Sequence, residues 1–362
     1  GGPYLYARAT FGRFAGLQTG WMAYLTRLTA SAAVVNLFVS YLGVFLPGAT
    51  SRSGSLLVVT LLLAGLAAIN YRGVGPGAGV SSAFAVLKLA GLTLFVVAGL
   101  AWLAGAGNQP VSAPPPPPGL DPWLGTMLVL VFAYGGFEAA LMPLAEARDP
   151  ERDAPVALFV ALGAASVVYM LVQAVVTLTL ADPGATATPL ADAARGFLGN
   201  SGAALIAATA LLSTTGYLAG AMVNVPRLTF AMAEQGDLPG RFAAVHPRFR
   251  TPFVSILVFA ALAWILAASG SFLQNVSLSV AARLVTYGLV CAAVPALRRR
   301  DGTSRAAPPA RFRLPGGVVL AGLGGLGMIV MAIQVSRREA LIMAVVIGLA
   351  TVHYLTGRRR AG

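Results

Sequence analysis

Long apolar runs, separated by short polar or Pro-rich stretches, dominate the pattern of this chain. A helix rises about 1.5 Å per residue, so a run of about 18 to 20 apolar residues spans a hydrocarbon layer of roughly 30 Å. Ten runs come close to this length or exceed it. They lie at about 14–46, 55–72, 79–106, 123–147, 154–181, 197–234, 253–269, 272–297, 316–335 and 338–356. The pattern predicts ten membrane-spanning helices.

Composition supports this prediction. Of the 362 residues, 57% are hydrophobic and only 10% are charged. An ordinary soluble domain has about 25% charged residues, and its core could not hide so much apolar surface. The composition therefore excludes a soluble fold. We predict an all-α integral membrane protein in which residues 1–362 form a single transmembrane domain.

The net charge of +13 is distributed in a way that indicates an orientation. If the N-terminus is cytoplasmic and ten spans alternate, most of the 25 basic residues fall in the inner loops. Such a bias is the positive-inside rule, and it predicts that both termini are cytoplasmic. Because the bias accounts for the high charge, the sequence indicates no nucleic-acid partner.

Catalytic and metal-binding chemistry have little support in the sequence. Cys291 is the single cysteine and lies in an apolar run, which excludes a disulfide framework. The two histidines, His246 and His353, lie at or near the ends of inner loops. His353 falls near the end of the last run, and the spans hold no Asp/His metal cluster and no histidine to serve a serine nucleophile. We predict neither an enzyme nor a bound metal or cofactor.

Charged side chains inside the apolar runs are candidates for function, because a charge at membrane depth costs a few kcal/mol. Arg227 lies close enough to the polar stretch 233–237 to snorkel to the inner surface. The role of Arg283 is open on the sequence alone. The full set is Arg27, Lys88, Glu138, Arg227 and Arg283.

The run 123–147 contains the adjacent glycines Gly135 and Gly136, followed by Glu138 and Pro143. Glycines weaken a helix and proline removes a backbone donor, so the span is predicted to break here. Broken helices at membrane depth line cavities, where freed backbone groups and helix ends can bind a polar substrate. The alternative is a notch for close helix packing, with Glu138 paired to an arginine.

Other polar residues of the spans have two readings each. Lys88 is the only lysine, and lysine, unlike arginine, can deprotonate when buried. It can therefore exchange a proton, or it can snorkel to the membrane surface. Arg27 lies about one-third into the first span, where its partner is either Glu138 or a substrate carboxylate. Ser213 and Thr214 can hold Lys88 or serve only helix packing.

Several segments together resemble the amino acid–polyamine–organocation (APC) superfamily of permeases. The likeness rests on GGPYLYAR at 1–8, NYRGV at 70–74, FAYGGFE at 132–138 with AEARDPERDAP at 145–155, and PRLTFAMAEQGDLP at 226–239 with HPRFRTP at 246–252. The resemblance implies a five-plus-five inverted-repeat fold with two trailing helices. It aligns the ten spans with helices three to twelve, so we expect the family's first two helices to be missing from this chain.

The resemblance also implies roles for single residues. In the family, backbone carbonyls at the break of the sixth helix receive the substrate amino group, and a nearby aromatic ring gates the site. The implied substrate-binding residues are Arg27, Phe132, Ala133, Tyr134, Gly135, Gly136 and Phe137. The implied proton-coupling residues are Lys88, Glu138, Ser213 and Thr214.

These features favour secondary active transport of amino acids across a bacterial cytoplasmic membrane, with proton symport by alternating access. The expected partners are an amino acid and the lipid bilayer, and the driving force is a proton gradient rather than a cofactor. Two alternatives stay open. One is an exchanger of amino acids or polyamines, and the other is an inactive or regulatory truncated membrane protein.

Overall fold

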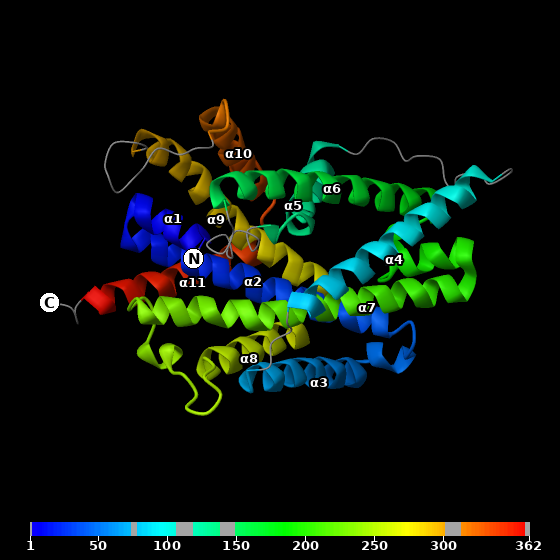
Figure 1. Ribbon diagram of the computed structural model, residues 1–362, viewed down its shortest axis with the longest axis horizontal. Helices are drawn as coiled ribbons and strands as arrows, with labels where there is room; N and C mark the ends of the chain where they lie inside the picture. Colours follow the sequence, from blue (N-terminus) through cyan, green and yellow to red (C-terminus); the bar gives the residue numbers. More distant parts are fainter. Residues whose placement is uncertain (1, 74–77, 106–118, 138–148, 301–312, 359–362) are drawn as a thin grey trace.

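The computed structural model is all-helical in the residues that it describes, which are 2–73, 78–105, 119–137, 149–300 and 313–358. Eleven α-helices lie in these segments (Figure 1). They are α1 (Gly2–Phe11), α2 (Arg13–Leu42), α3 (Arg52–Tyr71), α4 (Ala78–Ala104), α5 (Leu120–Ala133), α6 (Pro150–Thr179), α7 (Pro189–Glu234), α8 (Phe253–Ser269), α9 (Phe272–Arg300), α10 (Gly317–Ala332) and α11 (Arg337–Arg358).

Each of the ten predicted spans overlaps one of these helices. Seven helices are long and apolar enough to cross a membrane, namely α2, α3, α4, α6, α7, α9 and α11. Helices α5, α8 and α10 are apolar but shorter. The apolar pattern did not predict α1. It also missed the first turns of α7, which begins at Pro189 and kinks at Gly199, where φ is 67°. Only glycine adopts this conformation readily, so the kink separates a short leading helix from the span itself.

Helix α2 lies at the centre of the bundle and packs against α9, α7, α8 and α11 (Figure 1). Its middle is rich in small buried residues, including Ala30, Ala32 and Ala33. Small side chains let helix backbones approach closely, which is how helices associate within a membrane. Helices α3 and α8 lie side by side along one edge of the bundle.

The outer helices expose large apolar side chains. On α3, Leu57 and Leu61 are 60% and 64% exposed, and on α6 Phe159 and Val160 are exposed to a similar degree. A soluble monomer does not leave such extended apolar surface in water. The prediction of an all-helical membrane protein is confirmed by this surface together with the length of the helices.

A buried carboxylate after the end of α7 joins this helix to α1 and to the start of α2. Asp237, just after α7, is fully buried and lies 2.8 Å from both Arg8 and Arg13. The hydroxyl of Tyr4 on α1 donates to the same carboxylate at 2.7 Å. Burial, with the neighbouring Asp237, raises the pKa of Tyr4 to about 12, so this hydroxyl stays a donor at physiological pH. Residues of two predicted inner segments, the N-terminal stretch and the loop after α7, therefore meet at one end of the bundle.

Candidate functional site

Helix α5 ends where the adjacent glycines predict a break. After Ala133, the amide of Gly135 donates to the carbonyl of Phe132 at 3.0 Å, one residue short of the α-helical spacing. Gly136 then takes a φ of 110°, which residues with a side chain rarely adopt. We call residues 134–137 the helix break. Glu138 and Pro143 lie outside the described residues.

The break frees backbone carbonyls, and side chains of two other helices bind them. The guanidinium Nη1 of Arg283, on α9, donates to the carbonyl of Val131 at 3.1 Å. The hydroxyl of Tyr169, on α6, donates to the carbonyl of Ala133 at 3.1 Å. In an unbroken helix these carbonyls would accept from amides four residues later. The carbonyls of Val131 and Ala133 therefore accept polar groups from outside the helix.

Arg283 packs directly against the break. Its side chain is only 5% exposed, and a Cβ placed on Gly135 would lie 1.1 Å from its Nη1. Gly135 is therefore required for the space that it leaves to the guanidinium. The Arg283 Cζ lies 5.9 Å from the ring centroid of Tyr287, one turn further along α9. The Tyr287 ring in turn contacts Phe137, with centroids 5.8 Å apart.

The predicted residue Arg27 lies on α2, which contacts the same helix α9. Next to Arg27, the carbonyl of Thr26 accepts a hydrogen bond from the buried hydroxyl of Ser279 at 2.8 Å. Ser279 is one helical turn before Arg283, so α2 meets α9 beside the level of that arginine. The Arg27 side chain is half-buried. Its role in substrate binding stays a prediction.

Lys88 lies on the face of α4 that packs against α7. One turn before it, Phe84 contacts Gly216, where an added Cβ would lie 3.1 Å from the ring. One turn after it, Gly91 is so close to Thr209 that an added Cβ would lie 2.5 Å from the threonine side chain. Residues three and four apart share one face of a helix, so Lys88 sits between these two close approaches.

Between the same two approaches, α7 presents Ser213. Ser213 is half-buried, whereas the described residues leave Lys88 exposed. The hydroxyl of Thr214 donates to the carbonyl of Ala210 in its own helix at 2.8 Å. Among the described residues, no hydrogen bond joins Lys88 to either hydroxyl. The register therefore places Ser213, more than Thr214, within the reach of a Lys88 side chain that turns toward α7.

The structure adds residues that sequence reasoning did not place at the break. The side chains that contact the end of α5 and the break include Arg283 and Tyr287 of α9 and Tyr169 of α6. The charge of Arg283 at membrane depth was the available signal for the first. Tyr169 gave no signal beyond being a tyrosine in an apolar span.

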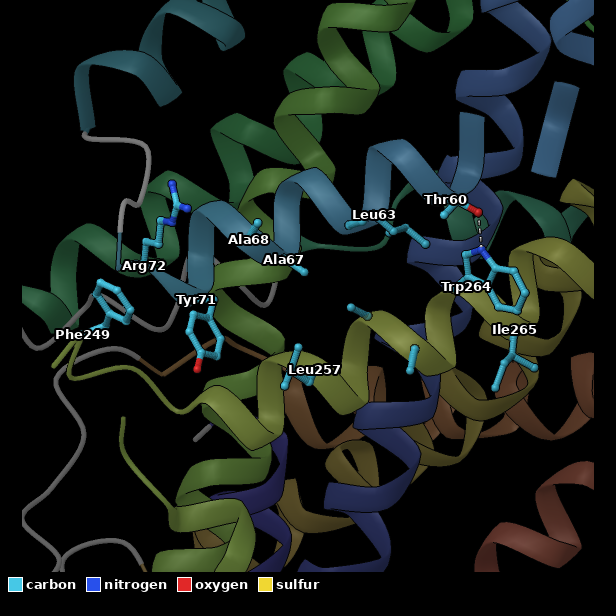
Figure 2. A pocket seen from close by; sticks show the side chains of 13 residues that line it. Thr60, Leu63, Ala67, Ala68, Tyr71, Arg72, Phe249, Leu257, Trp264 and Ile265 are labelled. Carbon is cyan, nitrogen blue, oxygen red and sulfur yellow. Dashed lines mark hydrogen bonds between the residues drawn. The ribbon is translucent and has the colours of Figure 1, made fainter. Parts of the chain in front are cut away.

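A large groove elsewhere on the bundle is mainly apolar. It has a volume of about 880 Å³ and lies between α3 and α8, as Figure 2 shows. Leu63, Ala67 and Leu257 line its middle, Tyr71 and Arg72 lie at one end, and a 2.8 Å hydrogen bond joins Trp264 to Thr60 at the other. No residue predicted for the substrate site lines this groove. Its apolar walls match the lipid-facing surface of the outer helices.

Comparison with known proteins agrees with the helical pattern. A family model described as "Amino acid permease" matches residues 1–352. An uncharacterised transporter of Mycobacterium tuberculosis is 32% identical over 352 residues, which cover 93% of this chain and 77% of that protein.

Two relatives from Bacillus subtilis have named substrates. A methylthioribose transporter is 28% identical, with 87% of this chain and 70% of that protein covered. A branched-chain amino acid permease is 26% identical, with 89% and 72% covered. The matches confirm the resemblance inferred from the sequence motifs, and they place the protein among transporters and not enzymes. This chain belongs to the amino acid permease family.

Proposed function

We propose that the protein is a proton-coupled secondary transporter that carries amino acids across the bacterial cytoplasmic membrane. Membership of the permease family supports transport. We infer the five-plus-five inverted-repeat fold, with the ten spans of this single permease domain as helices three to twelve. Substrate binds at mid-membrane, and one helix bundle rocks against the other to alternate access.

The helix break is the observation that carries the proposal. The carbonyls of Val131 and Ala133, just before it, already accept donors from α9 and α6. A substrate ammonium group is a donor of the same kind, and a freed carbonyl at membrane depth is a strong acceptor because water does not compete there. Phe132 precedes the break and Phe137 is its last residue, and an aromatic ring there can close over a bound substrate.

Lys88 is the proposed proton carrier. It is the only lysine of the chain, and it lies between two close approaches of α4 and α7 at the level of Ser213. Lysine, unlike arginine, can give up its proton, so movement of α4 against α7 can load and release a proton. Glu138 stays a candidate for the same chemistry through the sequence alone.

The orientation of the chain belongs to the proposal as well. Most basic residues fall in the loops predicted to be inside, which favours cytoplasmic termini. The ion pairs of Asp237 with Arg8 and Arg13 bring the beginning of α2 and the end of α7 to the same side. If the N-terminus is cytoplasmic, both segments lie on the cytoplasmic side.

Uptake into proteoliposomes tests the function. Purified full-length protein is reconstituted, an inward proton gradient is imposed, and a panel of labelled amino acids is offered. We expect at least one amino acid to accumulate, and a protonophore to abolish its accumulation. Uptake that is the same with and without the proton gradient would refute proton coupling. Uptake that occurs only when the vesicles are preloaded with amino acid would instead identify an exchanger.

A further inference from the structure

Arg283 is a buried positive charge. In the part of the chain that the structure describes, Asp237 and Arg283 are the two charged residues that are fully buried. Asp237 is neutralised by two arginines. Arg283 forms none of the ion pairs found among the described residues, and its Nε is buried without a hydrogen-bond partner. A buried charge that forms no ion pair within the described residues, which do not include Glu138, is a candidate for function at membrane depth.

The guanidinium is also held in place. It donates to the carbonyl of Val131, it fills the space above Gly135, and it lies near the ring of Tyr287. These contacts come from both α5 and α9, so Arg283 is fixed at the break and does not extend toward the membrane surface. Its positive charge therefore stands beside the carbonyls at which the proposed site receives an ammonium group.

We propose that Arg283 makes this site select against ligands with a net positive charge, so that it binds neutral or anionic amino acids and rejects cationic amino acids and polyamines. The proposal rests on the proposed function, because it assumes that substrate binds at the helix break. A zwitterion brings a carboxylate that offsets its own ammonium group. A cationic amino acid or a polyamine brings an additional positive charge, and like charges a few ångströms apart repel strongly where water is scarce.

A purely structural Arg283 would have a different signature. The hydrogen bond to Val131 stabilises the break for every ligand alike, so its loss would weaken all ligands by a similar factor. The charge acts differently on cations and on zwitterions. The ratio of cation affinity to zwitterion affinity therefore measures the effect of the Arg283 charge. A change that weakens all ligands equally leaves this ratio unchanged.

The experiment measures ligand-induced thermal stabilisation of the purified full-length protein. The panel contains neutral, acidic and cationic amino acids together with putrescine. We expect neutral or acidic amino acids to stabilise the wild type. Lysine, arginine and putrescine should bind at least about tenfold more weakly. In Arg283→Gln, the ratio of cation affinity to neutral-ligand affinity should rise about tenfold.

Two further variants keep the test decisive. Arg283→Lys retains the charge and should retain the discrimination against cations. It is the variant to measure if Arg283→Gln does not fold. Arg227→Gln removes an exposed arginine of α7 and should leave the affinity ratio unchanged. Wild type that prefers cations, or a ratio that does not change in Arg283→Gln, would overturn the proposal while leaving transport intact. Absence of any amino-acid binding and uptake would instead remove the proposed function itself.

Discussion

Gly135→Ala is expected to reduce substrate affinity and uptake severely. The added methyl carbon would lie 1.1 Å from Nη1 of Arg283, which two non-bonded atoms cannot tolerate. Either the guanidinium leaves the carbonyl of Val131 or the break itself shifts. Overpacking of this kind costs about 1–3 kcal/mol, which corresponds to a loss of about 5-fold to 150-fold in affinity. The measurement is uptake and binding of the best ligand in proteoliposomes.

The same helix provides a matched control. An added Cβ on Gly125, two turns before the end of α5, meets no atom within 4 Å. Alanine is favoured over glycine in a helix by about 1 kcal/mol, so Gly125→Ala should be neutral or slightly stabilising. If Gly135→Ala transported at the wild-type rate, the packing of Arg283 against the break would have no part in binding.

Lys88→Ala is expected to abolish accumulation against a gradient while substrate still binds. With one proton carried per substrate, each unit of pH difference supports about tenfold accumulation. The variant should reach only equal concentrations inside and outside. Lys88→Arg should fail in the same way, because arginine keeps its proton. The measurement is the steady-state ratio of internal to external substrate at an imposed pH difference.

A neighbouring substitution separates this effect from damage to α4. Leu89 is exposed on the same helix, and Leu89→Ala should accumulate substrate as the wild type does. Lys88→Ala that still concentrates substrate in response to the gradient would exclude Lys88 as the proton carrier. If Lys88→Ala lost both substrate binding and accumulation, Lys88 would belong to the substrate site.

Local features of the chain were predictable from the sequence. The apolar runs located the helices, because the hydrophobic thickness of a membrane fixes the length of a spanning helix. The adjacent glycines located the end of α5, because the preference for a break is local. The helix α1 was not predicted, because its ten residues are not a long apolar run.

Long-range contacts were beyond sequence reasoning. Arg283 and Val131 are 152 residues apart, and no periodicity indicates that they meet. Gly135 was interpreted as a source of backbone freedom, whereas the structure gives a steric reason for glycine at this position. The pairing of Asp237 with Arg8 and Arg13 likewise depends on how α1 and α7 pack. Such contacts follow from tertiary packing, which a single sequence does not encode in any local pattern.

Substrate protection of a single cysteine tests most directly whether the helix break is the substrate site. Cys291 is the one native cysteine, so Cys291→Ala gives a background without thiols. Into it we place Ala133→Cys, at the exposed end of α5, or Ala64→Cys, in the apolar groove between α3 and α8. Labelling by N-ethylmaleimide is then timed in detergent with and without a saturating amino acid. We expect the amino acid to slow labelling of Ala133→Cys and to leave labelling of Ala64→Cys unchanged. Protection in the groove but not at the break, in a protein that still binds the amino acid, would show that the helix break is not the substrate site.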